Sequence, residues 1–182
     1  MSIHRIILLI CILLFASACA LLGGTRSQPL PASSLLAEFS QHGATVTIRL
    51  EVASDGSTML VATFTPQEAD GHFYSKDLPP EGVDGIGRPT RLELAPASLM
   101  QAAGELTDSV LAEDLVISPD LPALPSYPAG PVTLTLPVTL PAGSGEIVTD
   151  QVLITYMVCT PRGCQRPVVG KVIEVNIPTQ GE

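Results

Sequence analysis

Val152–Val169 reads Val-Leu-Ile-Thr-Tyr-Met-Val-Cys-Thr-Pro-Arg-Gly-Cys-Gln-Arg-Pro-Val-Val, two β-favouring runs on either side of a short turn. The turn is Pro161–Gly163, and a cysteine stands close to each of its ends. Runs of this kind that meet at a proline- and glycine-containing turn are typical of a β-hairpin. The stretch therefore predicts a hairpin with Cys159 and Cys164 facing each other across its mouth, and this pair is the candidate reactive centre.

The segments before this hairpin carry a related pattern. Ala44–Ala53 alternates apolar and polar side chains with a period of two, which indicates a half-buried strand. A turn at Asp55–Ser57 leads into Thr58–Phe64, whose return predicts a second hairpin. Ala97–Glu113 has a weak helical period that Gly104 interrupts, so we expect either a turn of helix or an irregular crossover there.

Further short strands complete the expected fold. They are a short aromatic strand from Gly71, then Thr90–Leu94, Leu115–Ile117, Val132–Leu140 and a longest hairpin of Glu146–Cys159 with Val168–Ile177. The chain has 17 prolines and 15 glycines in 182 residues, which favours turns over long helices. Seven or eight short antiparallel strands separated by turns predict an all-β, two-sheet sandwich.

The N-terminus has the features of an export signal. Met1–Arg5 is positively charged, Ile6–Phe15 is wholly apolar, and Ala16–Ala18 supplies small residues before Cys19. This pattern predicts a lipoprotein signal in which Cys19 is lipidated. The same small residues also suit ordinary signal peptidase, and Ile6–Leu22 approaches the length of an uncleaved anchor. All three alternatives place the body of the protein outside the cytoplasm, and the first and third anchor it to the cell membrane.

The expected layout follows from these signals. Residues 1–18 form the signal sequence, 19–34 a flexible linker rich in glycine, proline and serine, 35–178 one domain, and 179–182 a tail. The net charge of −9 argues against nucleic acid as a partner and against adhesion to anionic lipid by charge. Membrane contact is therefore expected through the N-terminal anchor.

Cysteine usage isolates one pair. Cys11 lies in the apolar segment and Cys19 at the processing site, which leaves Cys159 and Cys164 in the mature domain, in a compartment where disulfides persist. The pair could be redox-active, a structural bridge or part of a metal site. A bridge across so short a loop stabilises by only about 2 kcal/mol in the chain-entropy model, which weakens the purely structural alternative.

The charges and imidazoles near the pair bear on these alternatives. Arg162, Arg166 and Lys171 lie close to it in sequence, and positive charge would favour a thiolate. A metal would need more ligands, and His42 and His72 are the remaining imidazoles at no recognisable spacing, so we predict no metal site. The sequence also lacks the motifs of hydrolases and of nucleotide-binding proteins.

Aromatic residues are scarce, and one cluster stands out. His72, Phe73 and Tyr74 are consecutive in a chain with 4% aromatic residues and no tryptophan. They either pack the sandwich or, for Phe73 or Tyr74, cover the cysteine pair and so keep its thiols selective. Tyr127, in the proline-rich segment Ser118–Pro131, competes for that covering role.

Three segments together resemble a known family. Gly71–Ser75, Leu134–Leu140 and Thr155–Pro167, with a Tyr-x-x-Cys-x4-Cys-x-x-Pro core, are similar to the N-terminal periplasmic domain of the bacterial thiol:disulfide interchange protein (protein-disulfide reductase) family. The resemblance implies an immunoglobulin-like sandwich that receives electrons at its cysteine pair and passes them to oxidised periplasmic proteins. It matches Cys159 and Cys164 to the redox disulfide pair and makes Cys164 the residue that forms the mixed disulfide.

The sequence also departs from the family pattern. Met157 stands where the family usually has a polar residue, Gln165 stands where it has an aromatic or leucine, and its aromatic cap segment has no clear counterpart in Ser118–Pro131. The family's polytopic membrane part and thioredoxin-like part do not occur before Glu182. A carrier built this way would therefore need a separately encoded thioredoxin-like or membrane electron-transfer partner.

Two functional hypotheses follow. The first is an extracytoplasmic, membrane-tethered thiol-disulfide carrier that uses Cys159 and Cys164 and needs no organic cofactor. The second is a non-catalytic immunoglobulin-like binding module whose disulfide only pins the last hairpin. In that case Asp77–Pro89 or the proline-rich segment would be the contact surface.

Overall fold

The computed structural model describes residues 32–116, 119 and 122–181, and no helix occurs among them. The predictions for the signal sequence, for lipidation at Cys19 and for most of the linker concern residues outside this part. The strands are β1 Ser33–Gln41, β2 Ala44–Val52, β3 Thr58–Pro66, β4 His72–Phe73, β5 Arg91–Leu94, β6 Gln101–Ala102, β7 Thr107–Asp108, β8 Glu113–Leu115, β9 Leu124–Ser126, β10 Val132–Thr139, β11 Ile147–Tyr156, β12 Val158–Thr160, β13 Gly163–Cys164 and β14 Val168–Pro178. Within these ranges, no segment forms a helix with the length and apolarity needed to cross a membrane.

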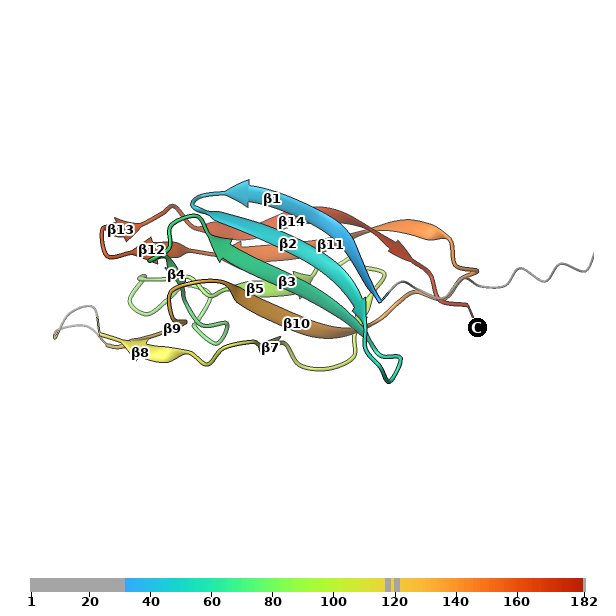
Figure 1. The fold of residues 1–182 in the computed structure, drawn as a ribbon, viewed down its shortest axis with the longest axis horizontal. Helices are drawn as coiled ribbons and strands as arrows, with labels where there is room; N and C mark the ends of the chain where they lie inside the picture. The colour runs from blue at the N-terminus through green and yellow to red at the C-terminus, as the bar shows by residue number, and fades with distance from the viewer. Residues whose placement is uncertain (1–31, 117–118, 120–121, 182) are drawn as a thin grey trace, which may run out of the picture.

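Two antiparallel sheets form the body of the sandwich (Figure 1). One has the order β1-β2-β3-β10-β6, with β7 also pairing with β10, and the other has the order β14-β11-β5. The predicted all-β sandwich of antiparallel strands is confirmed. Seven of its strands have four residues or more, and the rest are pieces of two or three residues that finish its edges and one end.

The two predicted hairpins are confirmed in register. Ala44 to Val52 pairs with Pro66 to Thr58 around a turn in which Gly56 has φ of 85°. β11 pairs with β14 from Ile147 opposite Pro178 to Tyr156 opposite Val168. Alternating side chains of these strands point inward, and a buried row such as Val46, Ile48 and Leu50 fills the space between the sheets.

The segment expected as a helix turn or crossover is an irregular crossover. It contains only the short strands β6 and β7, which pair with β10 on either side of Pro137. Because proline has no backbone N–H, the gap between β6 and β7 suits this position. The turn before β6 is fixed by Asp150, whose carboxylate accepts hydrogen bonds from the backbone N–H groups of Leu99 and Met100, each at 3.0 Å.

Several boundaries differ from the expected ones. β1 begins at Ser33, inside the segment expected as linker, because this strand pairs with the outer edge of β2. The edge strand expected at 115–117 is β8, which begins at Glu113. The segment expected as a tail begins with Thr179, which is buried, and Gln180, which exchanges backbone hydrogen bonds with Pro141 and Gly143.

Five short strands form a curled sheet at one end of the sandwich. β13 pairs with β12 and β12 with β4, while β9 pairs with β8 and is joined to β4 by the bridge between Tyr74 and Ser126. Figure 1 shows these strands gathered at the end away from the C-terminus. The outermost strands of this curled sheet are β13 and β8.

A second, smaller core lies under the curled sheet. Its buried members are Tyr74, Leu78, Leu124 and Cys159, with Met157 and two loop residues packed against them. The main core contributes a neighbouring aromatic trio in which Phe64, Phe73 and Tyr156 contact each other edge to face. The cysteine pair therefore lies over packed apolar side chains at the end of the sandwich.

Candidate functional site

The cysteines occupy directly opposite positions of a two-residue hairpin. In the pairing of β12 with β13, Cys159 lies opposite Cys164 and Thr160 lies opposite Gly163, with Pro161 and Arg162 forming the turn. The two cysteines form a disulfide, with their Cα atoms 3.9 Å apart. The sequence stretch that predicts the hairpin therefore brings the two sulfurs together by the pairing of its own strands.

The two sulfurs have different surroundings. β12 lies between β4 and β13, and Cys159 on it is only 3% exposed. Cys164 lies on β13, the edge strand, and is exposed. One end of the disulfide therefore belongs to the small core and the other end is accessible to solvent.

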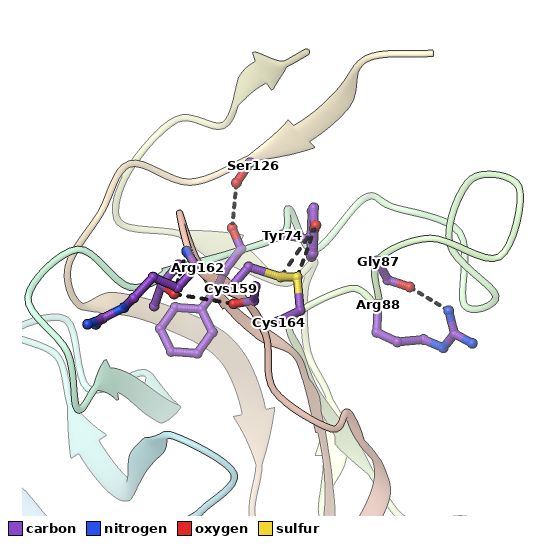
Figure 2. The surroundings of a disulfide bond; sticks show 10 residues. Tyr74, Gly87, Arg88, Ser126, Cys159, Arg162 and Cys164 are labelled. Carbon is purple, nitrogen blue, oxygen red and sulfur yellow. Dashed lines mark hydrogen bonds between the residues drawn. A yellow bond between two sulfur atoms is a disulfide. The ribbon is translucent and has the colours of Figure 1, made fainter. Parts of the chain in front are cut away.

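Tyr74 contacts both sulfurs through its hydroxyl group. The Tyr74 hydroxyl oxygen lies 3.5 Å from Cys159 Sγ and 4.0 Å from Cys164 Sγ (Figure 2). Because disulfide sulfurs carry no proton, the hydroxyl is the donor in either contact. The side chain is buried, and burial raises its pKa, so the phenol stays protonated and able to donate at neutral pH.

The loop between β4 and β5 positions Tyr74. The Thr90 hydroxyl donates a 2.7 Å hydrogen bond to the Tyr74 carbonyl. Gly87 has φ of 78°, and a Cβ there would lie 3.4 Å from the Tyr74 ring, so the backbone passes close against it. The Arg88 guanidinium, drawn with Gly87 in Figure 2, donates to the carbonyls of Glu81, Gly85 and Gly87 and holds the loop closed. These contacts hold the loop against the Tyr74 ring.

The other two cap candidates lie elsewhere. Phe73 is fully buried in the main core against Phe64 and Tyr156. The Tyr127 hydroxyl donates to Asp108 at 2.8 Å and accepts from the Lys76 backbone N–H at 3.0 Å. Of the three predicted candidates, Tyr74 is therefore the one whose polar group reaches the sulfurs.

The predicted cluster of cations does not assemble at the sulfurs. Arg162 forms an ion pair with Glu68, and Figure 2 shows its side chain extending away from the disulfide. Lys171 lies over the Phe39 ring, 5.3 Å from its centre, on the sheet formed by β14 and β11. Arg166 is exposed just beyond the hairpin. The expected support for a thiolate by Arg162 and Lys171 is therefore not seen in the oxidised structure.

His72 belongs to the site, although the sequence suggested only packing for it. His72 is on β4 and lies directly opposite Cys159 on β12. His72, Cys159 and Cys164 therefore form a row across one face of the curled sheet. Its Nε2 atom is buried without a hydrogen-bond partner in the described part of the chain, and burial lowers its pKa. The alternation of His72 and Tyr74 around the core residue Phe73 is the sequence signal that places both on the sulfur side.

A cavity of about 540 Å³ opens beside the disulfide. Its walls come from β4, β8 and the cysteine hairpin, and its lining residues are Asp70, His72, Tyr74, Leu115, Cys159, Thr160, Pro161, Arg162, Gly163 and Cys164. Among the described residues, no group of three or more His, Cys, Asp or Glu side chains could hold a metal ion. The arrangement offers a solvent-accessible disulfide with a hydrogen-bond donor beneath it and a space alongside it.

Fold and site together define an all-β sandwich that carries an edge-strand disulfide. No family model matches the sequence, and no curated protein matches it. Among solved structures, the chain is similar to the crystal structure of the DsbD N-terminal domain from Neisseria meningitidis in the reduced form. That match has a TM-score of 0.44 and 18% sequence identity, and it covers 84% of this chain and 91% of that one.

Proposed function

We propose that this protein is an extracytoplasmic thiol-disulfide exchange domain that uses Cys159 and Cys164 as its redox pair. The observation that carries the proposal is the asymmetry of the disulfide, with Cys164 exposed on an edge strand and Cys159 buried beside the Tyr74 hydroxyl. A thiol from another protein can approach Cys164 but not Cys159. Exchange through one defined sulfur requires this difference in access.

The reaction proceeds in two balanced steps. A partner thiolate attacks Cys164 Sγ, the bond to Cys159 Sγ breaks, and Cys159 leaves with the electron pair as a thiolate. A second partner thiolate then attacks the partner's sulfur in the mixed disulfide and releases the Cys164 thiolate. Two electrons and two protons pass to the pair, and the partner's dithiol becomes a disulfide. The reverse sequence reduces an oxidised partner.

The hairpin has supports that do not depend on the disulfide. The Gln165 N–H donates to the Val158 carbonyl at 2.8 Å, and β12 also pairs with β4. The Thr160 hydroxyl accepts from the Arg162 N–H at 3.2 Å inside the turn. Since a bridge across this short loop adds only about 2 kcal/mol in the chain-entropy model, we expect the fold to persist after reduction, as a cycling pair requires.

We propose that the partners are a separately encoded thioredoxin-like or membrane electron-transfer protein and oxidised extracytoplasmic proteins. The N-terminal sequence, with its apolar segment before Cys19, supports tethering to the cell membrane through a lipidated cysteine. Mass spectrometry of the mature N-terminus tests the tether, since a diacylglyceryl adduct on Cys19 is expected and an unmodified N-terminus after residue 18 would reject it.

A redox titration tests the exchange function. The purified protein is equilibrated in dithiothreitol or glutathione buffers of graded potential, its free thiols are alkylated, and the oxidised fraction is measured. We expect the midpoint to lie above about −300 mV. A pair that stays oxidised below that potential would be a structural bridge, and the alternative of a non-catalytic binding module would then hold.

Two serine variants provide a matched comparison of the sulfurs. Cys159→Ser leaves only the exposed thiol, and Cys164→Ser leaves only the buried one. We expect Cys159→Ser to be alkylated and to form mixed disulfides at least about tenfold faster than Cys164→Ser, because reactivity follows exposure of the thiolate. Equal rates would remove the structural basis for a single entry sulfur.

A further inference from the structure

The free edge of β13 presents the backbone of the exposed cysteine. Cys159 and Cys164 are a non-hydrogen-bonded pair, because the flanking bond joins Gln165 N–H to the Val158 carbonyl. In such a pair the N–H and C=O groups of both residues point away from each other. Those of Cys159 face β4, and those of Cys164 therefore face outward, where the described part of the chain provides no further strand.

Apolar side chains lie on the opposite rim of the cavity. Leu115, on β8, lines the same cavity as the disulfide. Next to β8, the side chains of Leu111 and Val116 are 84% and 66% exposed. Exposed apolar side chains that lie together are typical of a contact surface. The cavity is therefore bounded by a free strand edge on one side and an apolar rim on the other.

The charges at this surface are mainly acidic. Asp70 lines the cavity, and Glu113 and Asp114 line the adjoining hollow, which shares His72 and Leu115 with it. None of these three carboxylates has an ion-pair partner among residues 32–116, 119 and 122–181. Arg162, which also lines the cavity, is neutralised by Glu68. A positively charged ligand segment would complement this surface.

We infer that the site takes an extended, cysteine-containing segment of a partner protein, aligned along the free edge of β13. The segment forms backbone hydrogen bonds with Cys164, an apolar side chain next to its cysteine enters the cavity toward Leu115, and a basic residue lies near Asp70. This inference rests on the proposed exchange function and adds the class of substrate. It disfavours glutathione, which is small and acidic.

The exchange step fixes the place of this segment. Its cysteine thiolate attacks Cys164 Sγ, the disulfide breaks, and the electron pair leaves on Cys159 Sγ beside the Tyr74 hydroxyl. A second cysteine of the same partner then resolves the mixed disulfide. A sulfur that bonds to Cys164 brings its own backbone within a few ångströms of the β13 edge, so the edge and the cavity fall inside the partner's footprint.

Synthetic peptides test the inference on the purified mature protein. The reference peptide is acetyl-Lys-Val-Cys-Val-Lys-amide, and its rate of mixed-disulfide formation is compared with those of a serine-for-valine peptide, a glutamate-for-lysine peptide, a peptide N-methylated at both valines, and glutathione. Each rate is divided by the same thiol's rate with a small aromatic disulfide, which removes differences in intrinsic reactivity. We expect each change to slow the normalised rate, with about a thirtyfold loss on N-methylation, since two backbone hydrogen bonds contribute about 1 kcal/mol each.

A matched pair of protein variants locates the apolar contact. Leu111→Ser changes an exposed leucine two residues before β8, and Leu35→Ser changes a leucine that is 56% exposed on β1. We expect Leu111→Ser to slow the reference peptide several-fold while its rate with 2-mercaptoethanol stays unchanged, and Leu35→Ser to alter neither rate. Normalised rates that are equal for all peptides and for glutathione would overturn the inference.

The two proposals fail in distinguishable ways. If the disulfide reacts with 2-mercaptoethanol at a moderate potential but shows no preference among the peptides, the exchange function stands and the substrate class is wrong. If the disulfide resists every thiol, the exchange function fails and the inference fails with it.

Discussion

The Tyr74 hydroxyl oxygen lies 3.5 Å from Sγ of Cys159, inside the smaller core of the domain. When Cys159 is the leaving sulfur, negative charge develops on an atom that is almost fully buried. A buried thiolate without a hydrogen bond is costly, and the phenol is positioned to donate one. Tyr74 is therefore expected to influence how readily the disulfide opens.

Replacing Tyr74 with phenylalanine tests this role. Tyr74→Phe keeps the ring and removes the donor, so we expect reduction by dithiothreitol to slow by about tenfold, because hydrogen bonds to charged groups contribute about 1.5–3 kcal/mol. The measurement is the rate of thiol release at constant pH. The matched control is Tyr127→Phe, whose hydroxyl binds Asp108 and the Lys76 N–H instead, and it should not change this rate. Equal slowing in both variants would point to a general loosening of the fold.

Two glycines with the same backbone conformation separate packing from strain. Gly85 and Gly87 both have φ of 78°, but a Cβ at position 85 meets nothing within 4 Å, whereas one at position 87 lies 3.0 Å from a Leu78 methyl and 3.4 Å from the Tyr74 ring. Gly87→Ala should therefore lower the free energy of unfolding by about 1–3 kcal/mol more than Gly85→Ala, the range typical of overpacking. Urea unfolding of both variants measures the difference, and identical midpoints would show that the loop does not press on Tyr74.

The burial of His72 predicts a dependence of stability on pH. Burial lowers the pKa of His72 in the folded state below its unfolded value of 6.5. The unfolded chain therefore takes up the proton first as the pH falls, so the stabilisation is present above pH 6.5 and is lost as the pH falls through the folded-state pKa. The Glu146 carboxyl, whose pKa is lowered to about 2 mainly by the Ser144 hydroxyl, acts in a separate range below pH 4.5.

Urea unfolding between about pH 7.5 and about pH 5 measures the effect of His72. The wild-type protein should lose stability over this range, and His72→Gln should lose less. If His72→Gln lost as much stability as the wild-type protein over this pH range, groups other than His72 would cause the loss.

The sequence predicts the two hairpins and the pairing of the cysteines because these depend on local patterns. Alternation in Ala44–Val52 and the turn at Pro161 and Arg162 each specify strand contacts between neighbours in the chain. β1 was not predicted, since it contributes an edge strand whose pairing is set by β2. Short pieces such as β6 and β7 likewise take their conformation from β10.

The candidate site was predicted in part. The cysteine pair follows from the sequence, but the choice of Tyr74 among three aromatic candidates depends on contacts between residues 85 positions apart. Arg162 and Lys171 do not gather at the sulfurs for the same reason, because Glu68, in the loop after β3, pairs with Arg162, and Phe39, on β1, lies beneath Lys171. Composition identifies which residues could act, and the tertiary contacts decide which of them reach the sulfurs.

β1 begins and β14 ends at the end of the sandwich away from the cysteine hairpin (Figure 1). A molecule attached by either terminus to a bead, a fusion protein or a lipid surface would therefore point Cys164 outward. β1 has nine residues, so the sandwich is about 30 Å long in the direction of this strand. The reactive sulfur would then lie about one strand length farther from the point of attachment than the terminus of the sandwich, and the segment before β1 would add to its reach.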